Sequence, residues 1–252
     1  EWKAEGKNPE ILFWVGSAGS FDERAKKITR SFVKILNKAN ITFGVLGQEE
    51  SCSGDVAKRA GNEFLFQMQA INNINILNSY SVTRIVTTCP HAFNTIKNEY
   101  PSLGGSYEVM HHTQFINSLI KEDKLEFKNE NLNNNRITYH DPCYLGRGNS
   151  IYNEPRELLK KIGADLIEMK RSKERSFCCG AGGAQMFKEP EKGDKDINIE
   201  RTEEALLTSA KIIATGCPFC NTMLTDGVKN KEKEADVKVL DIAELISKAN
   251  NL

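Results

Sequence analysis

Apolar and polar residues follow two different periods along the first half of the chain. Residues 11–15 (ILFWV) are apolar at every position, which predicts a strand that is buried on both faces. Between residues 22 and 37, apolar side chains recur every three or four positions, which is the spacing of a helix with one buried face. The same criteria predict further strands at 41–46, 84–88 and 108–110, and further helices at 61–77, at 113–120 and from Pro90 onward.

The pattern begins again after a polar, asparagine-rich segment at residues 121–136. We interpret this segment as the boundary between two domains, residues 1–122 and residues 136–252. The second half is predicted to contain strands at 137–140, 164–169, 211–215 and 237–240, and helices at 154–162, at 198–210, from Pro218 and from Ile242. Because strands alternate with helices throughout, we expect an α/β fold in which each half has a mostly parallel sheet with flanking helices.

The two halves also resemble each other residue by residue. ILFWVGS at residues 11–17 aligns with ITYHDPC, which lies 126 residues later. SCSGD at 51–55 aligns with CCGAG at an offset of 127, and IVTTCPHAFNT at 85–95 aligns with IATGCPFCNT at an offset of 128. Three matches at a nearly constant offset indicate an internal duplication. We therefore expect two similar α/β repeats that are related by a pseudo-two-fold axis.

Cysteines distinguish the two copies of this repeat. The second copy contains five of them, Cys143, Cys178, Cys179, Cys217 and Cys220. The first copy has at the matching positions Ser17, Ser51, Cys52, Cys89 and Ala92. Only the second copy therefore keeps a complete set. The odd total of seven cysteines, with one adjacent pair and one CxxC, argues against the disulfide framework of a secreted protein.

The five cysteines of the second copy are suited to metal binding, because thiolates are the preferred ligands of iron–sulfur clusters. The motif Cys217-Pro218-Phe219-Cys220 follows a predicted strand and opens a predicted helix, whose free N–H groups and dipole favour bound negative charge. After the adjacent pair at 178–179, Gly180 gives the backbone the freedom to bend and to approach a bound group closely. All three cysteine segments fall at strand-to-helix turns, the edge where open α/β sheets place their sites.

Three other interpretations of the cysteines stay open on the residues alone. Four of them could bind structural zinc, for which an adjacent pair and a fifth cysteine are superfluous. They could also be inert thiols that pack in the core. The third interpretation is a thioredoxin-like redox pair, which would need only the CxxC motif.

Composition and missing motifs exclude several classes of function. The 252 residues include 34 basic and 34 acidic ones, so we expect no nucleic-acid partner. The apolar runs are too short to cross a bilayer, and we expect a cytoplasmic protein. The sequence lacks the ferredoxin run CxxCxxCxxxC, the dinucleotide fingerprint GxGxxG after a strand, and a Walker A motif. Electrons would therefore have to arrive from, and leave to, other subunits.

The spacing Cys-x34-Cys-Cys-x37-Cys-x-x-Cys resembles the cysteine-rich CCG domain of the B-type subunit of heterodisulfide reductase and its relatives. Those relatives include iron–sulfur subunits of lactate utilisation, of glycolate oxidase and of anaerobic glycerol-3-phosphate dehydrogenase. The resemblance covers essentially the whole chain as two CCG repeats. The phrases HDPCYLGRGN, RSFCCGAGGAQMF, CPFCNTMLTDG and CPHAFNTIKNEYP are similar to the C-terminal region of membrane-linked oxidoreductases that pass electrons from electron-transfer flavoprotein to quinone.

This resemblance implies one non-cubane 4Fe–4S cluster in the C-terminal half, held by five cysteines. Position by position, the implied ligands are Cys143, Cys178, Cys179, Cys217 and Cys220, with Gly180 beside them. In the first half, Cys52 and Cys89 alone cannot supply such a set, so no second cluster is expected.

The resemblance also implies an oxidoreductase subunit that needs partners. We expect an iron–sulfur electron-transfer subunit that relays electrons from flavoprotein-linked oxidation toward a membrane quinone reductase. The expected partners are a ferredoxin-type or membrane iron–sulfur subunit and electron-transfer flavoprotein, which would hold the chain peripherally at the inner membrane. The alternatives are a subunit of a lactate-oxidising, glycolate-oxidising or disulfide-reducing complex, and a zinc-binding scaffold without redox function.

Several further residues are candidates for chemistry. Cys52 and Cys89 stand at positions of the degenerate motif that match two cysteines of the intact motif. If they lie close together, they would form a redox-active disulfide. The alternative is that they are left over from the duplicated motif and pack in the core. His140 lies just before the first cysteine of the intact motif and is a candidate to tune a cluster or to carry a proton. Arg147 is a candidate to offset negative charge or to bind a partner. Weaker candidates, since a lone histidine is more often structural, are His91, His111 and His112.

Overall fold

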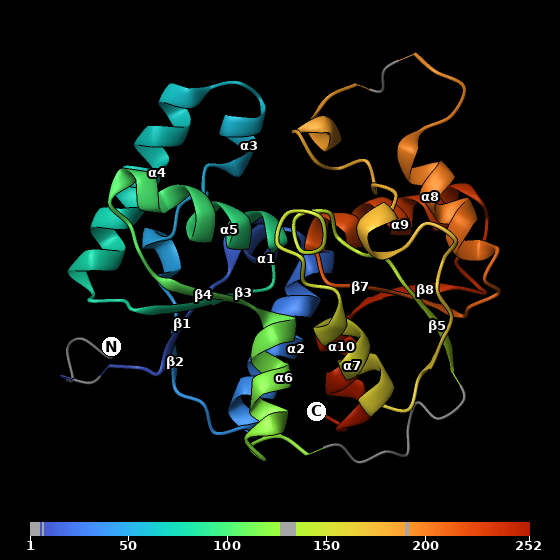
Figure 1. Cartoon of the computed structure of the whole chain (residues 1–252), viewed down its shortest axis with the longest axis horizontal. Coiled ribbons are helices and arrows are strands. Elements are labelled where there is room, and N and C mark those ends of the chain that lie inside the picture. Colours follow the sequence, from blue (N-terminus) through green and yellow to red (C-terminus); the bar gives the residue numbers. More distant parts are fainter. Residues whose placement is uncertain (1–5, 7, 127–134, 190–191) are drawn as a thin grey trace. The chain divides into compact units, whose positions relative to one another are not determined.

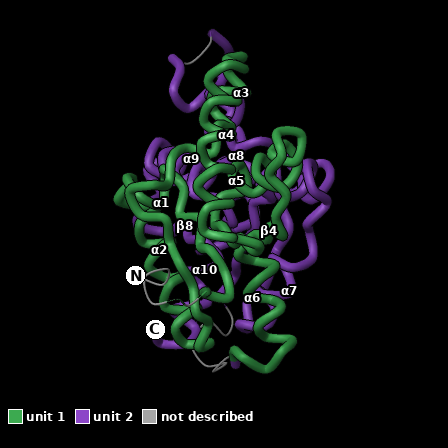
Figure 2. Tube along the Cα trace, turned by 90° about the vertical axis from the view of Figure 1, so that its left-hand side faces the viewer, with its two compact units in different colours: residues 1–125 green, residues 126–252 purple. Residues whose placement is uncertain are grey.

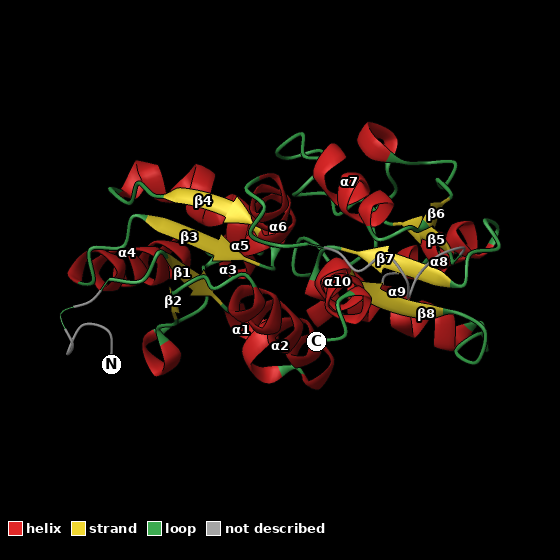
Figure 3. Ribbon diagram, turned by 90° about the horizontal axis from the view of Figure 1, so that it is seen from below, coloured by secondary structure: helices red, strands yellow, loops and turns green. Residues whose placement is uncertain are grey.

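The computed structural model describes residues 6, 8–126, 135–189 and 192–252. The chain divides into two compact units, residues 1–125 and residues 126–252, which Figure 2 shows in different colours. Each unit contains one four-stranded sheet with helices on both of its faces (Figures 1 and 3). The prediction of an α/β fold built from two similar repeats is therefore confirmed.

The sheet of the first unit has the strand order β2-β1-β3-β4, and every pairing in it is parallel. Its strands are β1 (Ile11–Trp14), β2 (Phe43–Gly44), β3 (Arg84–Thr87) and β4 (Glu108–His111). The central strands β1 and β3 are buried at almost every position, which is why they are apolar without alternation. In the register of the sheet, Ile85 lies between Leu12 and Val109.

Six helices among the described residues of the first unit connect these strands. They are α1 (Gly16–Phe21), α2 (Glu23–Lys38), α3 (Asp55–Arg59), α4 (Glu63–Ser79), α5 (Pro90–Asn94) and α6 (His112–Lys121). Helix α2 begins where the Asp22 side chain accepts a hydrogen bond from the backbone N–H of Ala25, and it buries its apolar face. Helix α5 runs on into a π-helical turn (Thr95–Glu99) and a 3-10 turn (Tyr100–Leu103).

The second unit repeats this arrangement with the strand order β6-β5-β7-β8, again parallel throughout. Its strands are β5 (Arg136–Tyr139), β6 (Asp165–Leu166), β7 (Ile212–Thr215) and β8 (Lys238–Asp241). Its helices are α7 (Asn153–Lys161), α8 (Ile197–Leu206), α9 (Pro218–Asn230) and α10 (Ile242–Ala249). Because the order matches that of the first unit, the sequence repeat corresponds to a structural repeat.

The structure differs from the sequence-based elements mainly at the edges of the sheets. The strands predicted at 41–46 and 164–169 are reduced to the two-residue strands β2 and β6, because each pairs with its neighbour at only two positions. Their flanking apolar residues still pack in the core, as Ile41 and Leu46 do. Helix α1 was not predicted. Half of the predicted linker at 121–136 lies outside the described residues, since 127–134 are not among them.

Within the part of the chain that the structure describes, no helix is both long and apolar enough to span a bilayer.

Helices α8 and α9 pack against each other at Gly227. A β-carbon on this residue would lie 2.8 Å from the Cβ of Thr202 and 3.2 Å from the carbonyl oxygen of Asn198, and still closer to the Thr202 hydroxyl. The missing side chain therefore allows the two helix backbones to approach closely, which sets the position of α8 beside α9.

Replacing Gly227 with Ala should push α8 away from α9, because the buried Thr202 has no space to move into. We expect the free energy of unfolding to fall by about 1–3 kcal/mol, as for other overpacked cores. Urea denaturation measures the change. Gly193→Ala is the control, since a β-carbon there meets nothing within 4 Å. An equal effect of the two substitutions would contradict the proposed close packing.

Candidate metal centre

The five cysteines of the intact motif lie on three segments of the second unit. Cys143 is in the turn that follows β5, and Cys217 caps helix α9 just after β7. Cys220 lies in the first turn of α9. Cys178 and Cys179 lie between the 3-10 turns Lys173–Arg175 and Gln185–Phe187. Since β5 and β7 are adjacent and parallel, their carboxyl ends deliver these segments to the same edge of the sheet.

The thiol groups of these cysteines contact one another in an unbroken string. The sulfur of Cys179 is 3.2 Å from the sulfur of Cys220. Hydrogen bonds between thiols also join Cys143 to Cys178, Cys178 to Cys179, and Cys217 to Cys220. The structure therefore brings all five sulfurs of the second copy together. All seven cysteines of the chain are free thiols.

Burial separates the five thiols into an inner and an outer group. Cys179, Cys217 and Cys220 are at most 3% exposed, and they form a small core with Ala181. Met186, Phe219 and Met223 pack against that core. Cys143 and Cys178 are only partly buried. The string therefore starts in a dry interior and ends at an edge that solvent or a partner can reach.

Electrostatics show that the five sulfurs cannot all be anionic by themselves. Hydrogen bonds from Cys143 and Cys179, and a further one from the backbone N–H of Gly180 at 3.3 Å, lower the pKa of Cys178. The pKa values of Cys143 and Cys179 are raised, first because each donates to Cys178 and then because burial disfavours a thiolate. Contact with Cys179 and Cys217 raises the pKa of Cys220 well above its ordinary value. Five thiolates at this edge would need bound cations.

Gly180 has the conformation that its motif predicts. Its φ of +92° lies in the left-handed region, where a residue with a β-carbon is strained. In this conformation its N–H donates to the sulfur of Cys178. A β-carbon would also lie 3.2 Å from the Cβ of Ile197 and 3.4 Å from the Cε of Met223. A side chain at this position would therefore disturb the turn that holds the cysteine pair.

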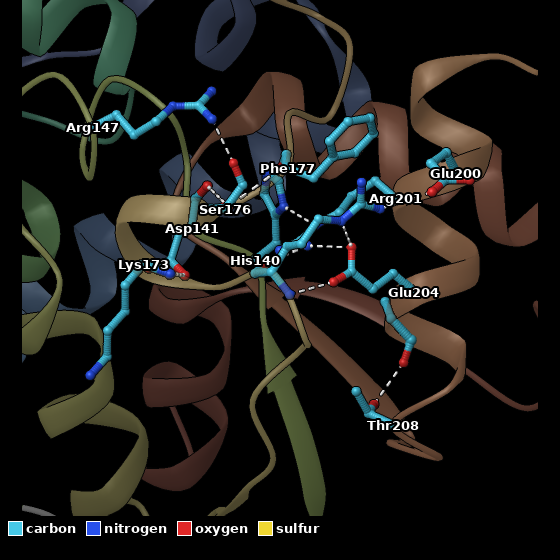
Figure 4. A network of polar contacts seen from close by, with 12 residues as sticks. His140, Asp141, Arg147, Lys173, Ser176, Phe177, Glu200, Arg201, Glu204 and Thr208 are labelled. Carbon is cyan, nitrogen blue, oxygen red and sulfur yellow. Dashed lines mark hydrogen bonds and ion pairs between the residues drawn. The ribbon is translucent and has the colours of Figure 1, made fainter.

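Buried charges tie the cysteine segments to the scaffold. Asp141, two residues before Cys143, accepts two hydrogen bonds from Arg156 at 2.7 and 2.9 Å and one from the backbone N–H of Lys173 at 2.8 Å. The Ser176 hydroxyl donates to the carbonyl oxygen of Asp141 at 3.1 Å (Figure 4). This network joins the turn after β5 to the segment that leads into the adjacent cysteine pair. The sequence analysis missed both Asp141 and Arg156.

Arg147 contributes to the same connection. Its side chain is exposed, and its Nη1 donates to the carbonyl oxygen of Ser176 at 2.6 Å (Figure 4). The positive charge therefore lies beside the outer end of the string, since Ser176 is two residues before Cys178. This position suits either of the roles that we predicted for Arg147, and both stay predictions.

His140 lies at the inner end of the string. It is 1% exposed, and one of its ring nitrogens is within 4.8 Å of the sulfurs of Cys179 and Cys220. The Nε of Arg201 donates to its Nδ1 at 3.0 Å (Figure 4). Burial, and then the charge of Arg201, lower its pKa well below the ordinary value. His140 is therefore neutral, and Arg201 is another residue that sequence reasoning missed.

The matching edge of the first unit is filled by hydrogen bonds within the protein. Ser51 donates from its hydroxyl to the Oδ1 of Asn73 at 2.8 Å. The Nδ2 of Asn73 donates to the carbonyl oxygen of Cys52 and to the hydroxyl of Tyr100. Asn73 thus lies between the degenerate motif and Tyr100, the first residue of the 3-10 turn that follows the π-helical turn. The three other motif positions lie at or in helices of the first unit. Ser17 is exposed in α1, Cys89 caps α5, and Ala92 is buried in α5.

Cys52 is half-buried and Cys89 is buried, and neither forms a disulfide. The other histidine candidates have structural partners. His91 pairs with the buried Asp55 at 2.8 Å. His111 and His112 are fully buried, 3.2 Å apart through their ring nitrogens, so they belong to the core of the first unit.

Asp141→Ala should strongly destabilise the second unit, because it removes one of the two carboxylates that pair with the buried Arg156, leaving only Glu168, and it takes the acceptor from the backbone N–H of Lys173. We expect a loss of about 3–5 kcal/mol in the free energy of unfolding, measured by urea denaturation. Asp165→Ala is the control, since Asp165 makes only an exposed ion pair with Arg136 and should cost less than about 1 kcal/mol. A small effect of Asp141→Ala would mean that the network does not hold the cysteine segments.

Glu50 should make the stability of the first unit depend on pH. Its carboxylate accepts hydrogen bonds from the N–H groups of Val15 and Gly16, but burial raises its pKa from 4.5 to about 7. Between these values the folded chain holds a proton that the unfolded chain has lost, so the free energy of unfolding falls as pH rises, by roughly 3 kcal/mol in total.

Glu50→Gln should remove this component of the pH dependence, while Glu49→Gln, a change at an exposed neighbour, should leave it in place. Denaturant titrations at several values between pH 4.5 and 7.5 measure the difference. An unchanged slope in Glu50→Gln would show that the carboxyl group does not retain its proton in the folded chain.

The chain is similar to a known protein family in both of its units. The family model of the CCG cysteine-rich domain matches the chain twice, at residues 11–97 and 137–225. "Probable iron-sulfur-binding oxidoreductase FadF" of Bacillus subtilis is 50% identical over 99% of this chain and 35% of its own length. "EtfAB:quinone oxidoreductase" of Syntrophomonas wolfei is 45% identical over 97% of this chain and 35% of its own length.

A third relative is a subunit of the dihydromethanophenazine:CoB–CoM heterodisulfide reductase of Methanosarcina barkeri, 35% identical over 96% of this chain and 59% of its own length. The chain thus spans about a third of the first two relatives. Among solved structures, glutamate racemase of Campylobacter jejuni aligns over 94% of this chain and 82% of its own, with a TM-score of 0.40 and 10% identity, which is too low to carry an argument. The family model covers both units, and the chain belongs to the CCG cysteine-rich domain family.

Proposed function

We propose that the second unit holds an iron–sulfur cluster and that the chain is an electron-transfer subunit of a redox complex. The observation that carries this proposal is the unbroken string of five thiols at one edge of the sheet. The names of the relatives support it, because they describe iron–sulfur binding, oxidoreductases and heterodisulfide reductase.

The donor set fits such a group. It consists of sulfur atoms in a partly apolar surrounding, which suits soft, thiolate-bound iron. Its mutual repulsion also requires bound positive charge, as the raised pKa values of Cys143 and Cys179 indicate. A structural zinc site needs four ligands and would leave one thiol of the string unused. We therefore favour a cluster over zinc.

A cluster bound at this edge would take up and release one electron at a time. The residues of the chain supply the surroundings that this chemistry needs. Gly180 directs its N–H at a sulfur, and the N-terminus of α9 presents its dipole to the thiolates of Cys217 and Cys220. The inner sulfurs are shielded from water, whereas Cys143 and Cys178 form the edge through which an electron would enter or leave.

We propose the cluster to be a single non-cubane 4Fe–4S cluster, with Cys143, Cys178, Cys179, Cys217 and Cys220 as its ligands. In the first unit, the space beside the degenerate motif is taken by hydrogen bonds of Asn73, which supports a single cluster.

We further propose that electrons come from flavoprotein-linked oxidation and pass toward a membrane quinone reductase. The relative named EtfAB:quinone oxidoreductase supports this direction over lactate or glycolate oxidation. A ferredoxin-type or membrane iron–sulfur partner would hold the chain peripherally at the membrane. Nucleic acid is not among the proposed partners, since the formal charge of the chain is zero.

Cys179→Ser should abolish iron binding, because Cys179 joins the two ends of the string through Cys178 and Cys220. Cys52→Ser, at the matching position of the first unit, should leave iron content unchanged. The measurement is iron and acid-labile sulfide per chain after purification without oxygen, with about four irons expected in the unmodified protein.

Two outcomes of that measurement would contradict the proposal. Protein that contains zinc and neither iron nor sulfide would favour the scaffold interpretation. Loss of iron in Cys52→Ser would show that the first unit contributes a ligand, and the assignment of all ligands to the second unit would then be wrong.

A further inference from the structure

The ring of His140 is held in one tautomer by its neighbour. The Nε of Arg201 is 3.0 Å from the Nδ1 of His140. A guanidinium group can only donate hydrogen bonds, so Nδ1 must be the acceptor and carries no proton. In a neutral imidazole the proton is then on Nε2. Contact with Arg201 therefore makes Nε2 a hydrogen-bond donor.

Arg201 itself has no freedom to turn away. It is fully buried, and its Nη1 donates to the carboxylate of Glu204 at 3.0 Å (Figure 4). The same Nη1 donates to the carbonyl oxygen of Arg171 at 2.9 Å. Glu204 is fixed in turn, because it also accepts hydrogen bonds from the backbone and side chain of Arg171. The orientation of His140 is therefore determined by a network that extends along α8.

The Nε2 of His140 has no hydrogen-bond partner among the described residues, although the ring is 1% exposed. A buried N–H without a partner costs about 1–3 kcal/mol. The acceptors at hand are sulfur atoms, since a ring nitrogen lies within 4.8 Å of the sulfurs of both Cys179 and Cys220. Because Nε2 carries a proton, it has no lone pair for a metal, so His140 is a donor to this site and not a ligand.

The fold does not require this hydrogen-bonded pair of His140 and Arg201. The alignment that places Ser17 opposite Cys143 places Trp14 opposite His140, and the alignment of Cys89 with Cys217 places Asn73 opposite Arg201. The first unit thus builds the same strand order without the pair. A buried arginine and histidine that are absent from the copy with the degenerate motif point to a role at the cysteines.

We propose that His140 donates its Nε2–H to a sulfur at the inner end of the cysteine string and that Arg201 is the positioning residue that fixes this tautomer. The inference rests on the proposed cluster. A hydrogen bond to a sulfur stabilises the reduced, more negative state more than the oxidised one, so it raises the reduction potential. His140 would thereby set how readily the site accepts an electron.

Two substitutions of His140 separate donor from acceptor. The Oδ1 of Asn can replace Nδ1 as the acceptor for Arg201 but offers nothing at the position of Nε2, whereas the amide nitrogen of Gln reaches the position of Nε2. In His140→Asn, we expect about a tenfold lower equilibrium constant for reduction, equivalent to a potential about 59 mV more negative for one electron. His140→Gln should stay near the unmodified value. Redox titration of the full chain, followed by EPR, measures both.

A matched pair tests Arg201 as a positioning residue. The amide nitrogen of Gln occupies the place of the arginine Nε and can still donate to His140, whereas Met has a similar length and no donor. Both substitutions remove the charge and the contact with Glu204, so their difference isolates the hydrogen bond. We expect Arg201→Met to have the more negative potential and Arg201→Gln to recover part of the change.

The unmodified protein supplies a direct readout that does not depend on how the variants fold. With 15N-labelled histidine, pulsed EPR should detect a weakly coupled nitrogen and an exchangeable proton, and both should be lost in His140→Asn. Iron-loaded protein without these signals, or iron-loaded His140→Asn with an unchanged potential, would overturn the role of His140 and leave the cluster standing. Absence of iron from the unmodified protein would instead overturn the proposed function.

Discussion

Repulsion among five closely packed thiolates is the constraint on which the second unit depends. Hydrogen bonds to neighbouring sulfurs and burial raise the pKa values of Cys143, Cys179 and Cys220, whereas the pKa of Cys178 is lowered, so five thiolates could exist together only with cations that neutralise the sulfur charges. The parallel sheet delivers the segments to one edge, Gly180 bends the chain between them, and Asp141 with Arg156 fastens two of them together. Each of these features brings the sulfur atoms so close together that five thiolates would need bound cations.

The sequence was sufficient for the fold and for the identity of the sulfur residues. Apolar runs without alternation indicate central parallel strands, and Cys143 and Cys217, which come shortly after β5 and β7, must therefore lie at the carboxyl edge of the sheet. The internal duplication allowed the two repeats to be compared position by position. This comparison showed that only the second repeat has a cysteine at all five motif positions. The edge strands β2 and β6 were overestimated, since Ile41 and Leu46 pack in the core without forming ladder hydrogen bonds.

The charged residues around the site could not be recognised from the sequence, for a physical reason. Arg156 and Arg201 lie in helices with many other charges, where an arginine is usually solvated. Arg156 is buried where Asp141 and Glu168 from other segments meet it, and Arg201 pairs with Glu204 one turn further along α8. The sequence contains one weak indication that Arg156 is buried. It lies three residues before Leu159, which places it on the apolar face of α7. Its partner becomes known only in the folded chain.

The central claim is that iron binds among the sulfurs of the second unit, and anomalous diffraction at the iron edge tests it most directly. Crystals of the full chain, grown without oxygen, should show iron peaks bounded by the sulfur atoms of Cys143, Cys178, Cys179, Cys217 and Cys220, with no iron beside Cys52 and Cys89. Iron peaks beside the first-unit cysteines, or a single peak at the five sulfurs that follows the zinc edge, would contradict the account.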